Sequence, residues 1–67
     1  MIAIWINGER RENIASRYIA QLVEELQLPA RALLIEHNGV ALRPDEWPQT
    51  KLAANDRIEL LRVVAGG

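Results

Sequence analysis

Cysteine is absent from this chain of 67 residues. Its absence excludes disulfide bonds, thiolate metal ligands and a cysteine nucleophile. A domain this small that has no disulfide bond must be held together by packing alone, which suits a reducing compartment. We therefore expect a cytoplasmic protein.

An excess of basic residues is absent too, since the net charge is −1 at pH 7. Arg10 and Arg11 are the only adjacent basic pair, and Glu9 and Glu12 flank them. Proteins that bind nucleic acids usually carry a clear basic patch. No apolar run approaches the ~20 residues that a membrane span requires, and no signal peptide pattern is present. We expect neither nucleic acid nor membrane as a partner.

Side chains that commonly carry catalysis are scarce. His37 is the only histidine, so a zinc site would lack ligands and a hydrolase triad would lack a base beside its nucleophile. We expect His37 to be a surface or hydrogen-bonding residue. The chain has one serine, Ser16, and one threonine, Thr50, and neither stands beside a base. Gly8 and Gly39 are isolated, which excludes a glycine-rich phosphate loop. We expect no enzyme activity and no metal site.

The first third of the chain predicts a hairpin followed by a helix. Residues 1–6 alternate as a half-buried strand, and the Asn7-Gly8 pair predicts a tight turn into a polar edge strand within 9–14. Apolar residues then recur with helical spacing over residues 16–27. We expect Ser16 or Asn13 to cap this helix and Pro29 to close it.

The remainder predicts three further strands. Residues 32–37 form a strand that turns at Asn38-Gly39 into a short return over 40–42. The two prolines of 43–48 predict a turn or a single helical turn, and the last strand covers 57–64.

These elements predict an α+β fold of the β-grasp (ubiquitin-like) type, a mixed sheet of four or five strands with one main helix on one face. The first and last strands are the most apolar, so we expect them side by side at the centre of the sheet, buried on both faces. Trp47 should cover the core, whereas Trp5 belongs either to the core or to the far sheet surface. The domain is expected to span 1–64, followed by a flexible tail over 65–67.

The Gly66-Gly67 pair that ends the chain is unusual. Two such glycines occur by chance on the order of 0.5% of the time at a glycine usage of ~7%. They directly follow an apolar strand, and residues without Cβ can enter a narrow channel and leave the last carbonyl unobstructed. A cloning remnant or a frayed end is the alternative. We expect the terminal carboxylate to carry the function.

As an ordered set, the segments of this chain resemble the ThiS family, the small sulfur carriers of bacterial thiamine biosynthesis. The matching segments are residues 2–8, 19–26, 35–39, Trp47, 55–60 and 66–67. Asn55-Asp56 stands where the family commonly has Gly-Asp, and asparagine also tolerates the left-handed conformation that such a turn requires. The segment before the helix lacks an Asp-Gly pair, which leaves the start of the helix open.

The resemblance implies a protein that is a co-substrate. A ThiF-like adenylating enzyme would use its own ATP and magnesium to activate the Gly67 carboxylate, so this chain would bind no cofactor. A persulfide protein would then supply sulfur, and the Gly67 thiocarboxylate would pass it to thiazole synthase. Gly66 would act as a spacer, and the free chain would be a monomer. The residues implied to dock on partners are Leu60, Arg62, Val64 and Ala65.

Two other interpretations remain open. The carrier that delivers sulfur to molybdopterin has the same tail chemistry, but those chains are typically longer and often have Pro-Pro where this one has residues 62–65. A plain β-grasp interaction module with incidental glycines belongs to a different class.

Overall fold

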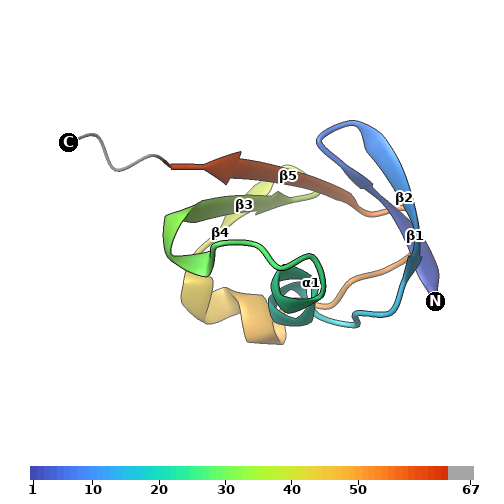
Figure 1. The fold of residues 1–67 in the computed structure, drawn as a ribbon, viewed down its shortest axis with the longest axis horizontal. Coiled ribbons are helices and arrows are strands. Elements are labelled where there is room, and N and C mark those ends of the chain that lie inside the picture. The colour runs from blue at the N-terminus through green and yellow to red at the C-terminus, as the bar shows by residue number, and fades with distance from the viewer. Residues whose placement is uncertain (64–67) are drawn as a thin grey trace.

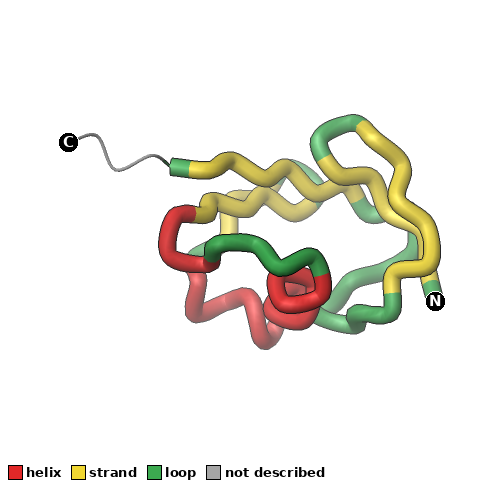
Figure 2. The backbone as a smooth tube through the Cα atoms, in the orientation of Figure 1, coloured by secondary structure: helices red, strands yellow, loops and turns green. Residues whose placement is uncertain are grey.

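A five-stranded sheet with one α-helix on one side forms the framework of the computed structural model, which describes residues 1–63 (Figures 1 and 2). In chain order the elements are β1 (Ile2–Ile6), β2 (Glu9–Ile14), α1 (Ile19–Glu25), the 3₁₀ turn η1 (Ala30–Ala32), β3 (Leu33–His37), β4 (Val40–Leu42), the 3₁₀ segment η2 (Pro44–Gln49) and β5 (Arg57–Arg62). The strand order is β2-β1-β5-β3-β4.

The first and last described strands lie together at the centre of the sheet, as expected. β1 runs parallel to β5, with Trp5 beside Arg57 and Ile6 beside Ile58. β3 pairs antiparallel with the other side of β5, which leaves β2 and β4 as the two edges. The expectation that the central strands are buried on both faces is wrong. α1 and η2 lie on the same side of the sheet, so Leu61 on the opposite face is 63% exposed (Figure 1).

The core lies between the sheet and α1. Alternate residues of the strands and the apolar stripe of the helix meet there, because both periodicities direct one face inward. Its buried members are Ile4, Ile6, Ile14, Ile19, Leu22, Val23, Leu33, Ile35, Trp47 and Ile58. Trp47 belongs to η2 and is 6% exposed, which confirms its expected position over the core.

The start of α1 differs from the expectation. Tyr18 is the N-cap residue, and the side-chain oxygen of Gln21 accepts hydrogen bonds from the backbone N–H groups of Arg17 (2.7 Å) and Tyr18 (3.2 Å). The predicted caps are therefore wrong. Asn13 has a φ of 60° where the pairing of β1 with β2 shifts register, and Ser16 binds elsewhere.

Helix α1 ends at Glu25, four residues before Pro29. Gln27 adopts a φ of 54°, and its N–H donates to the Glu24 carbonyl at 3.0 Å. The Leu28 N–H donates to the Val23 carbonyl, also at 3.0 Å. These two bonds form a Schellman motif, which terminates a helix without proline. Pro29 therefore follows the helix end and does not cause it.

Glu25 connects the end of α1 to the segment that follows β2. Its carboxylate accepts hydrogen bonds from the backbone N–H groups of Ala15 (3.2 Å) and Ser16 (3.0 Å), and from the Ser16 hydroxyl. The pKa of Glu25 is lowered, mainly because its carboxylate accepts the hydrogen bond of the Ser16 hydroxyl. Burial raises this pKa in part, and the hydrogen bonds from the two N–H groups lower it further. Ser16 is buried, so this carboxylate satisfies a polar group that has left water.

We predict that Glu25→Ala lowers the free energy of unfolding by about 1–2 kcal/mol, because it leaves the buried Ser16 hydroxyl and two N–H groups without their acceptor. Glu24→Ala is the matched control, since this neighbouring glutamate is exposed and should change stability by less than about 0.5 kcal/mol. Urea unfolding of both variants measures the difference. Equal losses would show that the Glu25 contacts contribute nothing specific.

Candidate functional site

The predicted functional end of the chain lies partly beyond the described residues. Gly66, Gly67, Val64 and Ala65 all lie outside residues 1–63. The structure therefore shows the strand that precedes them, β5, and the contacts that hold it.

Two of the predicted docking residues belong to β5. Leu60 pairs with Ile35 of β3, and its half-buried side chain packs against the core. Arg62 pairs with Leu33 and is exposed. The exposed apolar side chains at this end of the strand are instead Leu61 and Val63. Strand alternation from the buried Ile58 would have placed Leu61 outside.

The first Asn-Gly turn holds the middle of β5. Asn7 has a φ of 49°, and its side-chain amide reaches Leu60, fifty-three residues later. The Leu60 N–H donates to Asn7 Oδ1 at 2.8 Å, and Asn7 Nδ2 donates to the Leu60 carbonyl at 3.2 Å. The amide thus replaces the strand partner that β1 no longer supplies, since β1 ends at Ile6.

The second Asn-Gly turn holds the start of β5 in the same way. Asn38 has a φ of 51°, its N–H donates to the Arg57 carbonyl at 2.8 Å, and its Oδ1 accepts from the Arg57 N–H at 2.8 Å. Its Nδ2 donates to Asp56 Oδ1 at 3.1 Å. The sequence predicted both turns correctly, but it gave no indication that their asparagines bind β5.

Asp56 is the centre of a partly buried polar cluster at the start of β5. His37 Nε2 lies 2.7 Å from Asp56 Oδ2, and the Ala53 N–H donates to the same oxygen at 2.9 Å. Burial raises the pKa of Asp56, but the hydrogen bonds from His37, the Ala53 N–H and Asn38 outweigh it and leave the pKa below its ordinary value of 3.8. His37 is therefore a hydrogen-bonding residue, as expected.

The turn before β5 has the expected conformation. Asn55 adopts a φ of 69°, and its N–H donates to the Ala3 carbonyl of β1 at 2.7 Å. The turn therefore forms with asparagine at its left-handed position.

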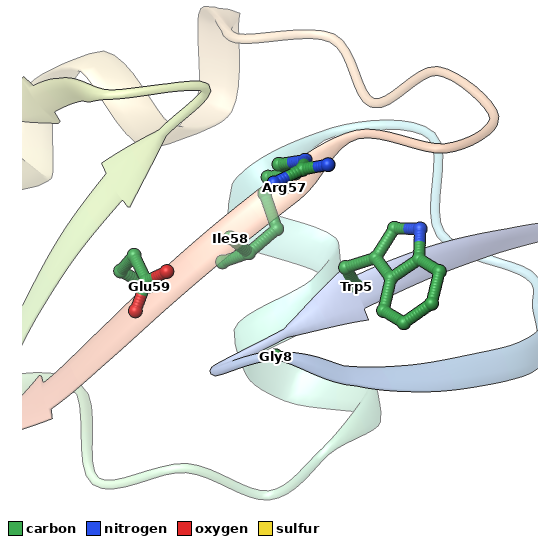
Figure 3. A pocket seen from close by; sticks show the side chains of 5 residues that line it. All are labelled: Trp5, Gly8, Arg57, Ile58 and Glu59. Atoms are coloured by element: carbon green, nitrogen blue, oxygen red, sulfur yellow. The ribbon is translucent and has the colours of Figure 1, made fainter.

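A pocket lies where β1 meets β5, on the face opposite α1. Trp5, Gly8, Arg57, Ile58 and Glu59 line it, and Figure 3 shows Trp5 and Arg57 on neighbouring strands. Trp5 therefore belongs to the far sheet surface, the second of its two expected positions. The Arg10 guanidinium lies 5.9 Å from the centre of its ring, within reach of a cation–π interaction.

Residues 1–63 contain neither a cluster that could hold a metal ion nor a helix that could span a membrane. Among these residues, no three His, Asp or Glu side chains are arranged so that they could hold a metal ion. None of the described helices has the length and apolar character needed to cross a membrane.

The chain matches the model of the ThiS family over residues 4–67. It also matches the crystal structure of a thiamine biosynthesis protein (ThiS) from Geobacter metallireducens, with a TM-score of 0.83 and 23% identity over 98% of this chain and 100% of that chain. The solution NMR structure of a thiamine biosynthesis protein from the same organism gives a TM-score of 0.80 and 22% identity, over 98% and 88% of the two chains.

At this level of identity the two structures show the fold alone, and they confirm the expected β-grasp architecture. A search of curated protein sequences gives no significant match.

We predict that Asn7→Asp destabilises the domain by about 1–3 kcal/mol, because a carboxylate keeps the acceptor for the Leu60 N–H but places an oxygen against the Leu60 carbonyl. Asn13→Asp is the matched control. Asn13 has a similar left-handed backbone, and within residues 1–63 its side chain makes no hydrogen bond. Thermal unfolding at pH 7 measures both, and similar losses would exclude a specific role for the Asn7 amide.

We predict that the Asp56 cluster makes the free energy of unfolding decrease as the pH falls into the acid range. Because the folded pKa of Asp56 lies below its unfolded value, its contribution is complete above about pH 4. The contribution is lost as the pH falls through the folded pKa. Urea unfolding between pH 7 and pH 2 should therefore show a smaller loss of stability for Asp56→Asn than for the original chain. Parallel pH profiles would contradict the assignment.

Proposed function

Because the chain belongs to the ThiS family, we propose that it is a sulfur carrier whose C-terminal Gly67 carboxylate is activated and loaded with sulfur. The observation that carries this proposal is the family match itself, which extends through Gly66-Gly67 to residue 67. The domain that precedes this pair has the fold of a ThiS protein.

The chemistry explains why a carrier needs a partner. A carboxylate is a poor electrophile, and transfer of AMP from ATP gives it a good leaving group while pyrophosphate is released. A ThiF-like adenylating enzyme would perform this step with its own ATP and magnesium. The outer sulfur of a persulfide protein would then displace AMP and form an acyl disulfide with Gly67, and a thiol would cleave its S–S bond, forming a disulfide and leaving a thiocarboxylate on Gly67. The ionised sulfur is a strong nucleophile, so the carrier acts as a co-substrate and not as the enzyme.

Within the described residues, strand β5 would support the segment that carries this carboxylate. β5 is the strand that leads to the tail, and Asn7 and Asn38 fix its backbone at Leu60 and Arg57. A reactive group presented by a fixed strand reaches its partner with less loss of conformational freedom. Gly66 would add reach without a side chain.

Thiazole synthase is the acceptor that we propose. The support is the related structure, which is that of a thiamine biosynthesis protein. The same tail chemistry would serve molybdopterin synthesis, so the acceptor has to be tested separately from the loading step.

We predict that incubation of the chain with ATP, its cognate adenylating enzyme and a persulfide donor increases its intact mass by the difference between one sulfur and one oxygen. Deletion of Gly67 should abolish this gain because the reacting carboxylate is lost. The melting temperature should stay unchanged, since the buried core residues lie between Ile4 and Ile58. Intact-mass spectrometry measures the gain in mass, and thermal unfolding measures the melting temperature.

An unchanged mass with an adenylating enzyme that is demonstrably active would overturn the carrier proposal. For the acceptor, the loaded chain should transfer sulfur to thiazole synthase and leave molybdopterin synthase without sulfur. The reverse result would assign the carrier to molybdopterin.

A further inference from the structure

The two Asn-Gly turns have nearly the same backbone and the same access to water. The φ values are 49° and 82° at Asn7 and Gly8, and 51° and 85° at Asn38 and Gly39. All four residues are exposed. In an Asn-Gly pair the glycine nitrogen can attack the side-chain amide carbon of the asparagine, because glycine has no side chain that obstructs the approach. A difference in reactivity between the two turns must therefore come from the groups that surround each amide.

The oxygen atoms of the two amides have equivalent surroundings. Asn7 Oδ1 accepts the Leu60 N–H at 2.8 Å, and Asn38 Oδ1 accepts the Arg57 N–H at 2.8 Å. A backbone N–H on this oxygen stabilises the negative charge that develops there when the amide carbon is attacked, as in an oxyanion hole. Both amides receive this assistance.

The nitrogen atoms of the two amides have different surroundings. Asn7 Nδ2 donates to the Leu60 carbonyl at 3.2 Å, and a carbonyl has no proton to give. Asn38 Nδ2 donates to Asp56 Oδ1 at 3.1 Å and lies 3.4 Å from His37 Nε2. Of the two amides, that of Asn38 therefore has an imidazole beside the nitrogen that must leave during deamidation.

The imidazole of His37 is oriented so that Nε2 carries a hydrogen. This nitrogen lies 2.7 Å from Asp56 Oδ2. The pKa of Asp56 is held below its ordinary value, so its carboxylate is ionised at pH 7 and can only accept. The hydrogen between the two groups is therefore on His37 Nε2. A proton donor that is oriented by a carboxylate and lies next to the leaving nitrogen is the arrangement that general acid catalysis requires.

We propose that Asn38-Gly39 is a self-modification site, at which His37 acts as the general acid for deamidation of Asn38, and that Asn7-Gly8 is not. The inference does not depend on the proposed carrier function, since it involves no partner protein and no residue of the tail.

The reaction consumes one water molecule and releases one ammonia molecule. The Gly39 nitrogen loses its proton to water and forms a bond to Asn38 Cγ, while the Arg57 N–H stabilises the oxyanion. The Cγ–Nδ2 bond then breaks, and the nitrogen leaves as ammonia with the Nε2 proton of the imidazolium form of His37, which is replaced from water. Water opens the resulting succinimide at either carbonyl, which gives aspartate or isoaspartate.

Either product weakens the contacts at the start of β5. A carboxylate at position 38 replaces the Nδ2 donor and faces the carboxylate of Asp56, so two like charges approach each other. Isoaspartate also adds one carbon to the backbone of the turn. Both changes disturb the hydrogen bond to the Arg57 N–H. Spontaneous modification at this turn would therefore limit the lifetime of the folded chain.

The test is incubation of the folded chain at pH 7, followed by peptide mass spectrometry that resolves positions 7 and 38. Deamidation increases the mass of a peptide by the difference between one oxygen and one NH group. We expect position 38 to react about tenfold or more faster than position 7, because general acid catalysis acts on it alone. Equal rates, or a faster reaction at position 7, would overturn the inference.

His37→Gln removes the acid but retains a side-chain N–H that can donate to Asp56. The ratio of the two rates should fall to about one, and an unchanged ratio would overturn the inference. The ratio is the measured quantity because partial unfolding of the variant would accelerate both positions.

Incubation of the original chain in concentrated urea supplies the second control. The cluster of His37, Asn38 and Asp56 exists only in the folded chain, so the two rates should become similar there. A difference that persists in urea would come from the sequence neighbours, Glu9 and Val40, and would also overturn the inference.

Discussion

The backbone of β5 has partners on the β1 side as far as Leu60 and on the β3 side as far as Arg62, and two side-chain amides complete this pairing. β1 supplies a parallel partner only as far as Ile6, so the Asn7 amide continues the pairing at Leu60. On the β3 side, the Asn38 side chain accepts a hydrogen bond from the Arg57 N–H. A central strand whose hydrogen-bonding groups are paired cannot easily slide in register, and the positions of the core and of the exposed sheet face opposite α1 depend on that register.

Much of the fold was predictable, because its signals are local. Period-two alternation defined the strands, and Asn7-Gly8 and Asn38-Gly39 marked the turns through residues that tolerate positive φ. The contacts of the asparagine amides were not predictable, because their partners are backbone groups that any residue would provide. The helix limits were wrong for a similar reason: Gln27 carries no sequence signal for a left-handed conformation, and Ser16 could bind Glu25 as readily as cap the helix.

The candidate site was predictable only in outline. The resemblance to the ThiS family implied that the last strand is a docking element, but the face that each of its residues occupies depends on how the sheet is covered. With α1 and η2 on one side, Leu60 turns toward the core and Leu61 toward solvent. The Asp56 cluster depends on contacts between residues that are distant in sequence, so no local pattern contains it.

The parallel pairing of β1 with β5 also has a consequence for how the chain reaches its folded state. It joins the first strand to the last described one, and the Asn7–Leu60 contact spans fifty-three residues. Contacts of such long sequence separation slow folding, because the intervening loop must close first. During synthesis β1 and β3 therefore wait with open edges until β5 emerges from the ribosome. The sheet is therefore complete only when β5 has paired with both β1 and β3.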